Sequence, residues 1–223
     1  MPDNPAIPPR GLEVRLKKAA GRSSASQRWL TRQLNDPFVR AAKAQGYRSR
    51  AAFKLEALDE KFGLIRPGHL VLDLGAAPGG WTQVALRRGA ARVAGIDLLP
   101  VAPLPGAEFL VGDFTDAALL PPLLASLGGA PDLVLSDMAP NTTGHAATDH
   151  LRIVALAELA LDCALQVLSP GGAFVAKLFQ GGAQRELLDP MKQRFATVRH
   201  VKPPASRKDS SELYVVATGF RGR

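Results

Sequence analysis

The sequence predicts an α/β fold built on a doubly wound, mostly parallel sheet that ends in an antiparallel pair of strands. From about residue 69 to residue 194, short apolar runs alternate with longer stretches of helical periodicity. This alternation is typical of parallel sheets with helices on both faces. After residue 194, two strand-like runs at 195–202 and 212–218 are separated by a proline-rich turn, Pro203-Pro204-Ala205-Ser206. We therefore expect a terminal antiparallel pair.

The expected elements follow from the N-terminus. Residues 1–34 are rich in Pro, Gly, Ser and basic residues, which predicts a basic, flexible extension, and residues 35–223 are expected to form a single domain. A helix is expected over 36–63, because apolar residues recur at helical spacing and Gly63 can end it. Expected strands cover 69–75, 92–97, 108–112, 132–137 and 172–179, and expected helices cover 80–88, 116–127, 148–168 and 183–194.

Composition limits the class of protein. A chain of 223 residues is long enough for a substantial core. Cys163 is the only cysteine and no Cys/His cluster has metal-ligand spacing, so we expect a reducing compartment, no disulfide and no metal. The N-terminus lacks the apolar stretch of a signal peptide, and no apolar run reaches the length of a bilayer span. These features predict a soluble, cytoplasmic protein that does not bind membranes.

Positive charge is concentrated at one end of the chain. The first 50 residues hold 11 Lys and Arg against 3 Asp and Glu, whereas the remaining residues hold 17 of each. The whole excess of +8 therefore lies in the first 50 residues. Such segregation is expected of a protein that binds a polyanion such as a nucleic acid. The alternative is a disordered basic tail that only aids solubility.

The most informative segment runs from Val71 to Gln83 and reads as a buried strand, a glycine-rich turn and a helix. A phosphate-binding P-loop is excluded, because Trp81 stands where its lysine is required. A dinucleotide site is disfavoured, because position 77 is Ala where the middle glycine would make room for a pyrophosphate. Asp97 follows at about the spacing at which a carboxylate meets a ribose. The turn therefore predicts a ribose-bearing ligand, the alternative being a tight turn that binds nothing.

Four expected strands end in acids, namely Asp73, Asp97, Asp113 and Asp137. Ligands of open parallel sheets bind outside the carboxyl ends of the strands, so these acids would face one crevice, although one of them could be a helix cap. Phe114 is placed to stack on an adenine ring. A crevice of carboxylates would repel a diphosphate but suits S-adenosylmethionine, which has an ammonium, a sulfonium and a diol.

Lys177 lies inside the otherwise apolar run 172–179. A buried lysine is costly unless it is paired, and burial or a neighbouring cation can make it a usable base. The alternative is a lysine whose ammonium reaches solvent. The loop that begins at Asp137 is where substrate would meet cofactor, whereas Glu212 by itself reads as a solvated residue at a sheet edge.

The motifs together resemble the FtsJ-type (RlmE) ribosomal RNA large-subunit 2′-O-methyltransferases from about Asp36 to Gly219. The resemblance implies a Rossmann-like, S-adenosylmethionine-dependent methyltransferase domain. It places a catalytic tetrad on Lys54, Asp137, Lys177 and Glu212. The motifs that carry it are Arg48-Ser-Arg-Ala-Ala-Phe-Lys-Leu, Asp73-Leu-Gly-Ala-Ala-Pro-Gly-Gly-Trp, Asp97-Leu-Leu-Pro, Gly112-Asp-Phe, Ser136-Asp-Met-Ala-Pro-Asn and Lys177-Leu-Phe-Gln-Gly. The expected cofactor residues are Asp73, Gly75, Pro78, Gly79, Trp81, Asp97, Asp113, Phe114 and Asp137.

The resemblance also implies the reaction. A methyl group passes from S-adenosylmethionine to the ribose 2′-hydroxyl of a uridine in 23S rRNA, within the assembled large subunit. Lys177 is expected to be the base, with Lys54 and Asp137 setting its charge state and orienting the hydroxyl. Glu212 is expected to hold Lys54 or the ribose. We expect a monomer.

Three alternatives remain at this point. A transfer-RNA or messenger-cap 2′-O-methyltransferase keeps the chemistry and changes the RNA, although a cap enzyme needs an aromatic pocket and the chain has only 9 Phe, 2 Tyr and 2 Trp. A small-molecule methyltransferase has no use for the basic segment. A non-catalytic ribosome-assembly factor would bind RNA, but the intact tetrad argues against it.

Overall fold

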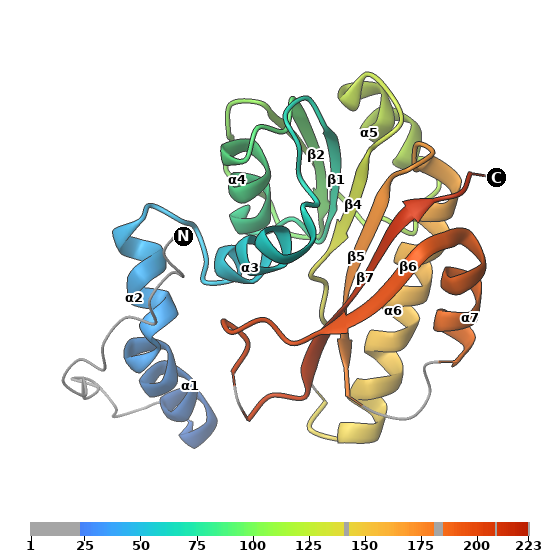
Figure 1. The fold of residues 1–223 in the computed structure, drawn as a ribbon. Helices are drawn as coiled ribbons and strands as arrows, with labels where there is room; N and C mark the ends of the chain where they lie inside the picture. Colours follow the sequence, from blue (N-terminus) through green and yellow to red (C-terminus); the bar gives the residue numbers. More distant parts are fainter. Residues whose placement is uncertain (1–22, 141–142, 181–184, 208, 223) are drawn as a thin grey trace.

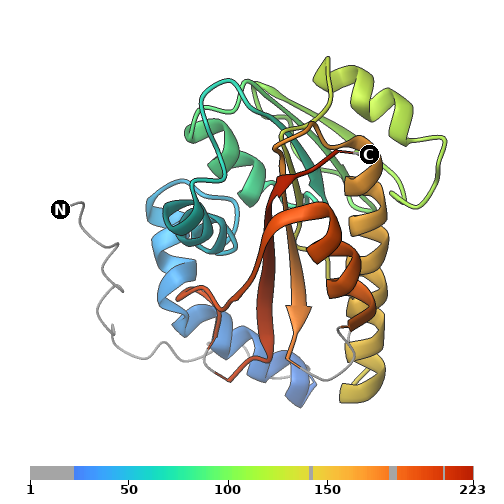
Figure 2. The same ribbon diagram turned by 45° about the vertical axis from the view of Figure 1, so that its right-hand side comes forward.

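The computed structural model describes residues 23–140, 143–180, 185–207 and 209–222. They form a seven-stranded sheet of order β3-β2-β1-β4-β5-β7-β6 with helices on both faces (Figures 1 and 2). Strands β1 to β5 are parallel, and β7 is antiparallel to both β5 and β6. The predicted fold class is confirmed. The strands are β1 Leu70–Leu74, β2 Arg92–Asp97, β3 Ala107–Val111, β4 Leu133–Ser136, β5 Ala173–Phe179, β6 Phe195–Val201 and β7 Glu212–Phe220.

The helices agree less closely with the sequence predictions than the strands do. Residues 24–34 fall in the predicted flexible extension but belong to a helix that ends at Asn35, whereas residues 1–22 lie outside the described residues. The single helix predicted over 36–63 is wrong, because two helices are separated by residues 45–51. The helices are α1 Ser24–Asn35, α2 Pro37–Ala44, α3 Ala52–Phe62, α4 Gly80–Arg87, α5 Leu120–Leu127, α6 Ala146–Val167 and α7 Arg185–Arg194.

The break between α2 and α3 has local and tertiary causes. Gly46 adopts φ 70°, a left-handed conformation that favours glycine and ends a helix. The Arg48 backbone N–H then donates to Gln83 Oε1 of α4 at 2.7 Å instead of continuing a helical ladder. The chain therefore turns between the two helices, and α3 can pack against α4.

Alternating side chains of the strands divide the core into two layers. Leu72 and Leu74 pack with α5, α6 and α7, whereas Val71 packs with α3 and α4. Because side chains alternate across a strand, Asp73 shares the face of Val71. Helix α2 lies beside α3, and α1 lies below α2, next to the connection between β6 and β7 (Figures 1 and 2). Among the residues that the structure describes, none of the helices could cross a membrane.

Candidate active site

The register of three neighbouring strands places the predicted catalytic side chains on one face. Val175 and Lys177 of β5 share the α3/α4 face, and Lys177 pairs directly with Tyr214 of β7. Glu212 lies two residues before Tyr214, so both point to the same face. Asp137 follows β4, whose Leu135 faces the same layer. Helix α3 covers this face and supplies Lys54.

The four tetrad residues form a connected cluster. Lys177 Nζ donates to Asp137 Oδ1 and to the Asp137 backbone oxygen, each at 2.8 Å. Lys54 Nζ lies 2.8 Å from Glu212 Oε2 and 3.9 Å from Asp137 Oδ1. A further 4.0 Å separates Lys177 Nζ from Glu212 Oε2. Two ammonium groups thus alternate with two carboxylates, which is how buried charges are tolerated.

Tyr214 joins this cluster and was not predicted from the sequence. Its hydroxyl donates to Asp137 Oδ1 at 2.6 Å and accepts from Lys54 Nζ at 3.0 Å. Burial raises the pKa of Tyr214 well above its usual value, and the charges of Asp137 and Glu212 add to the rise, so the phenol stays a donor. Within an apolar strand a tyrosine reads as a core residue. Its position two residues after Glu212 was the signal that could have found it.

The electrostatics of Asp137 favour its charged form. Burial by itself would raise the pKa of the Asp137 carboxyl, but the ammonium groups of Lys177 and Lys54 and the hydrogen bonds from Lys177 and Tyr214 bring it below its usual value. Asp137 therefore stays an anion that binds both lysines. Its position fixes Lys177 at the carboxyl edge of the sheet.

The glycine-rich turn lies at the switch point between β1 and β4, where the strand order reverses. Gly75 has φ 80°, and a Cβ there would overlap the Met138 side chain. Gly79 has φ 103°, and a Cβ there would lie 2.6 Å from Arg48 Nη1. The sequence analysis assigned both glycines to cofactor binding. In the structure they also let the turn pack against the protein itself.

Three predicted cofactor residues can reach a ligand at this edge. Asp97 is hydrogen-bonded to the turn. Its Oδ2 accepts from the Ala77 N–H and its Oδ1 from the Leu99 N–H, each at 2.8 Å. These bonds orient the carboxylate and leave further lone pairs for a diol. Asp113 is exposed and Phe114 half-buried at the end of β3. Leu98 and Leu99, which the sequence interpretation did not single out, expose 69% and 64% of their surface beside Asp97.

Asp73 and Trp81 lie away from the open edge. Asp73 is fully buried, and its Oδ2 accepts from Thr82 Oγ1 at 2.7 Å. Trp81 is 3% exposed, and its Nε1 donates to the Ala51 backbone oxygen at 2.8 Å. In this conformation both side chains support the turn from below and offer no surface to a ligand. Pro78, by contrast, is exposed on the turn.

The residues at this edge fit S-adenosylmethionine. Asp97 is the last residue of β2, whereas Asp113 and Asp137 follow the ends of β3 and β4 by two residues and one residue. Their carboxylates provide acceptors for hydroxyl and ammonium groups and no cationic cradle for phosphate. The exposed Leu98 and Leu99 add apolar surface on which the adenine ring of the cofactor can pack. No group of His, Cys, Asp and Glu in the described part of the chain could hold a metal ion.

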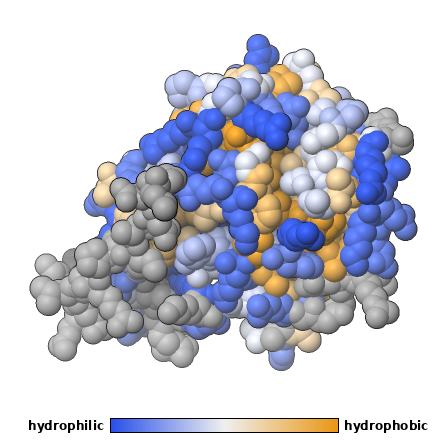
Figure 3. Space-filling view, in the orientation of Figure 1, coloured by the Kyte–Doolittle hydropathy of each residue, from blue (hydrophilic) through white to orange (hydrophobic). Residues whose placement is uncertain are grey.

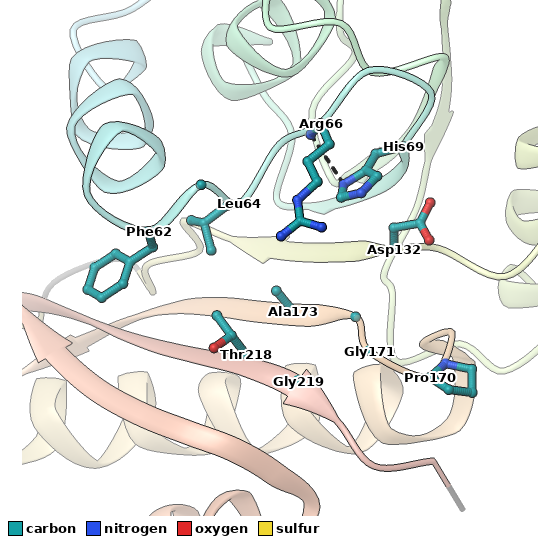
Figure 4. Close-up of a pocket in the computed structure, with 12 residues that line it drawn as sticks. Phe62, Leu64, Arg66, His69, Asp132, Pro170, Gly171, Ala173, Thr218 and Gly219 are labelled. Carbon is teal, nitrogen blue, oxygen red and sulfur yellow. Dashed lines mark hydrogen bonds between the residues drawn. The ribbon is translucent and has the colours of Figure 1, made fainter.

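Two cavities flank the sheet. The larger, about 460 Å³, lies at the amino ends of β4 and β5 and is lined by Arg66, His69 and Asp132 among others (Figure 4). Ala173, which lines this cavity, precedes Lys177 by four residues along β5, a separation of about 13 Å. No tetrad residue lines the cavity. The smaller, about 320 Å³, is lined directly by Lys54 and Glu212, together with Gln33, Arg50, Arg207, Asp209 and Ser210. The smaller cavity is therefore the one that belongs to the candidate active site.

Comparison with known proteins identifies the family. Residues 47–220 match the family model described as FtsJ-like methyltransferase. The chain belongs to the FtsJ-like methyltransferase family. The resemblance inferred from the motifs is thereby confirmed, and so is the enzyme class, a methyltransferase.

Relatives in this FtsJ-like family are similar over nearly the whole chain. A protein of Granulibacter bethesdensis named ribosomal RNA large subunit methyltransferase E is 69% identical over 97% of this chain and 94% of its own length. One of the same name from Acidiphilium cryptum is 66% identical over 95% of this chain and 94% of its own. A crystal structure of a ribosomal RNA methyltransferase from Plasmodium falciparum superposes with a TM-score of 0.69 at 30% identity, covering 79% of this chain and all of that one.

Proposed function

We propose that this FtsJ-like enzyme transfers a methyl group from S-adenosylmethionine to the ribose 2′-hydroxyl of a uridine in large-subunit ribosomal RNA. The proposal includes 23S rRNA in the assembled large subunit as substrate and a monomeric enzyme in the cytoplasm. The observation that carries the chemistry is the cluster of Lys54, Asp137, Lys177 and Glu212 between the cofactor edge and the 320 Å³ cavity. The names of the relatives support the substrate.

The bonds of Lys177 suit a base. Its Nζ donates twice to Asp137, which uses both N–H groups of a neutral amine and leaves its lone pair in the remaining tetrahedral direction. That lone pair accepts the proton of the 2′-hydroxyl as the oxygen forms its bond to the methyl carbon. The cofactor, when bound, supplies that methyl group, and the bond between its sulfur and the methyl carbon breaks.

The other residues of the cluster orient the reacting groups. Lys54, held by Glu212 and Tyr214, places a positive charge where negative charge develops on the 2′-oxygen. Asp137 bonds Lys177 and Tyr214 together and so fixes the base.

Two features favour RNA over a small-molecule substrate. The cavity beside Lys54 and Glu212 includes Arg50 and Arg207, whose guanidinium groups suit a ribose-phosphate chain. Figure 3 shows hydrophilic residues over much of this face of the molecule, with hydrophobic residues exposed near its centre. The basic excess of the first 50 residues lies on the chain that leads to this cavity, since Gln33 of α1 lines it.

Replacement of Lys177 tests the chemistry. Lys177→Ala and Lys177→Arg are expected to lower kcat about 10²- to 10⁴-fold, because alanine removes the base and arginine does not release its proton. Cofactor affinity, measured by calorimetry, should stay near the wild-type value. Lys192→Ala is the matched control, because that ammonium is 64% exposed on α7. Wild-type turnover by Lys177→Arg would exclude Lys177 as the base.

A substrate comparison tests the RNA. Incorporation of labelled methyl groups is measured on large ribosomal subunits, free ribosomal RNA and transfer RNA that lack the modification. The label is expected on a uridine 2′-oxygen of the large-subunit RNA. Preferential labelling of transfer RNA would favour the alternative substrate. Cofactor binding without transfer to any of these RNAs would favour a non-catalytic assembly factor.

A further inference from the structure

A cluster of one aspartate and two arginines lies beside the tetrad, and none of its members takes part in the proton transfer. The side chain of Asp36 is 6% exposed. Its Oδ2 accepts from Arg50 Nη1, and from Arg207 Nη2 and Nε at 3.2 and 3.3 Å. One buried carboxylate thus lies between two guanidinium groups and offsets part of their mutual repulsion.

This cluster contacts the connection between β6 and β7. Arg50 Nη2 donates to the backbone oxygen of Ala205, which is 1% exposed. The next residue, Ser206, donates from its hydroxyl to Glu212 Oε1 at 2.7 Å. The other oxygen of Glu212 accepts from Lys54 Nζ at 2.8 Å. A continuous path of contacts therefore leads from Asp36 to a tetrad lysine.

At its other end the cluster holds the joint between α1 and α2. The Asp36 N–H donates to the Gln33 oxygen at 3.4 Å, and its Oδ1 accepts from the Phe38 N–H at 3.0 Å. Asp36 therefore ends α1 and caps α2 with one oxygen while the other oxygen binds the arginines. Gln33, Arg50 and Arg207 all line the cavity beside the tetrad.

We propose that Asp36 is a positioning residue that ties the α1–α2 joint to the β6–β7 connection and thereby holds Glu212 in place for Lys54. This role rests on the proposed methyl transfer. The carboxylate keeps Arg50 bonded to Ala205, which places Ser206 against Glu212. Loss of its charge leaves Arg50 and Arg207 without their common anion, so residues 203–207 shift and Glu212 loses one of its two supports.

Asp36→Asn tests the role with little change in shape. Asparagine keeps the oxygen that caps α2 and removes the charge that the arginines require. We expect kcat on large ribosomal subunits to fall about 10- to 100-fold, since small misplacements at a reacting centre have effects of this size. The cofactor Kd should stay near wild type. Asp36→Glu should restore part of kcat.

Asp59→Asn is the matched control. The Asp59 side chain is 7% exposed, close to the 6% of Asp36. It accepts from one backbone N–H (Ile65, 2.8 Å) and pairs with one arginine (Arg88, 3.7 Å), but it lies at the far end of α3. Both variants lose a buried charge, so both lower stability, and only Asp36→Asn should lower kcat. An equal fall of kcat in both variants, or none in Asp36→Asn, would overturn the role.

A second measurement does not depend on the substrate. The Ser206 N–H donates to the Pro203 oxygen at 2.8 Å, so its hydrogen exchange reports on the β6–β7 connection in the free protein. Exchange at Ser206 should be faster in Asp36→Asn than in wild type and unchanged in Asp59→Asn. An unchanged rate of hydrogen exchange at Ser206 in Asp36→Asn would show that Asp36 does not hold the β6–β7 connection. Absence of methyl transfer by the wild-type enzyme would instead refute the proposed function.

Discussion

Asp73 shows how one residue of a binding motif can act from beneath the site. Its Oδ2 accepts from Thr82, whereas its Oδ1 has no hydrogen-bond partner within the part of the chain described. Burial raises the pKa of the Asp73 carboxyl to about 7, against the lowering effect of the Thr82 hydrogen bond and with a further rise from the charges of Asp137 and Asp97. The free protein therefore holds a carboxyl group that changes charge near neutral pH.

This pKa predicts a pH-dependent stability. Between about pH 4 and pH 7 the folded protein keeps a proton that the unfolded chain has released, so Asp73 lowers the free energy of unfolding as pH rises, by at most about 1.4 kcal/mol per pH unit. The Asp73→Asn variant has no carboxyl group at this position, so its free energy of unfolding lacks this decrease with pH. In urea unfolding without cofactor, the stability of Asp73→Asn relative to wild type should increase from pH 5 to pH 7 and then level off. A difference that is constant with pH would contradict the shifted pKa.

Residue-level prediction succeeded where a residue type was out of place in its pattern. Lys177 stands out because a lysine in a buried strand needs a partner, and the structure supplies Asp137. Tyr214 was missed because a tyrosine among Leu213 and Val215 looks like ordinary core. Only the pairing register of β5 and β7, which no local pattern contains, sets Tyr214 opposite Lys177.

At the scale of elements, apolar runs located the strands well, because a buried parallel strand is uniformly apolar. The sequence interpretation of 92–97 matches β2, and that of 172–179 exceeds β5 by one residue. Helix limits were harder to predict, because helical periodicity continued across Gly46 and did not reveal the tertiary bond of Arg48 to Gln83. Likewise, residues 116–119 were predicted as helix but form a turn in which Asp116 Oδ1 accepts from the Ala118 N–H.

The turn after β1 gives a prediction at this scale. Gly75→Ala should destabilise the protein by more than the about 1–3 kcal/mol expected for an unfavourable backbone conformation alone, because the new Cβ also overlaps Met138. Cofactor affinity should fall as well, since the turn and Asp137 would move apart. Urea unfolding and calorimetric cofactor binding measure the two effects.

Gly171→Ala separates the two causes. Gly171 has φ 84°, close to the 80° of Gly75, but a Cβ there meets no atom within 4 Å. The loss of stability in Gly171→Ala therefore measures only the cost of placing alanine in a left-handed backbone conformation. Cofactor binding should be unchanged, because Gly171 lies at the opposite edge of the sheet. Equal losses of stability in both variants would show that contact with Met138 is not what requires glycine at position 75.

At the scale of the whole molecule, the topology gathers the tetrad side chains at one edge of the sheet. The carboxyl ends of β4 and β5 and the antiparallel return of β7 bring the tetrad together, and α1 and α2 lead from the basic N-terminal segment to the cavity beside it. Residues 1–22 precede the Ser23 cap of α1. They carry five Lys and Arg against two Asp and Glu, so they can add contacts to the phosphates of an RNA.

Deletion of residues 1–22 is therefore expected to weaken RNA binding and leave cofactor binding unchanged. If each of the five basic residues contacts one phosphate, the slope of log affinity against log salt becomes less steep by about 3.5 to 4.5. The loss of affinity is then large at low salt and small at high salt, which filter binding over a range of potassium chloride concentrations can measure. A full-length variant with these five residues replaced by Gln separates charge from length, because it should reproduce the change in slope. An equal loss of affinity at every salt concentration would exclude phosphate contacts by this segment.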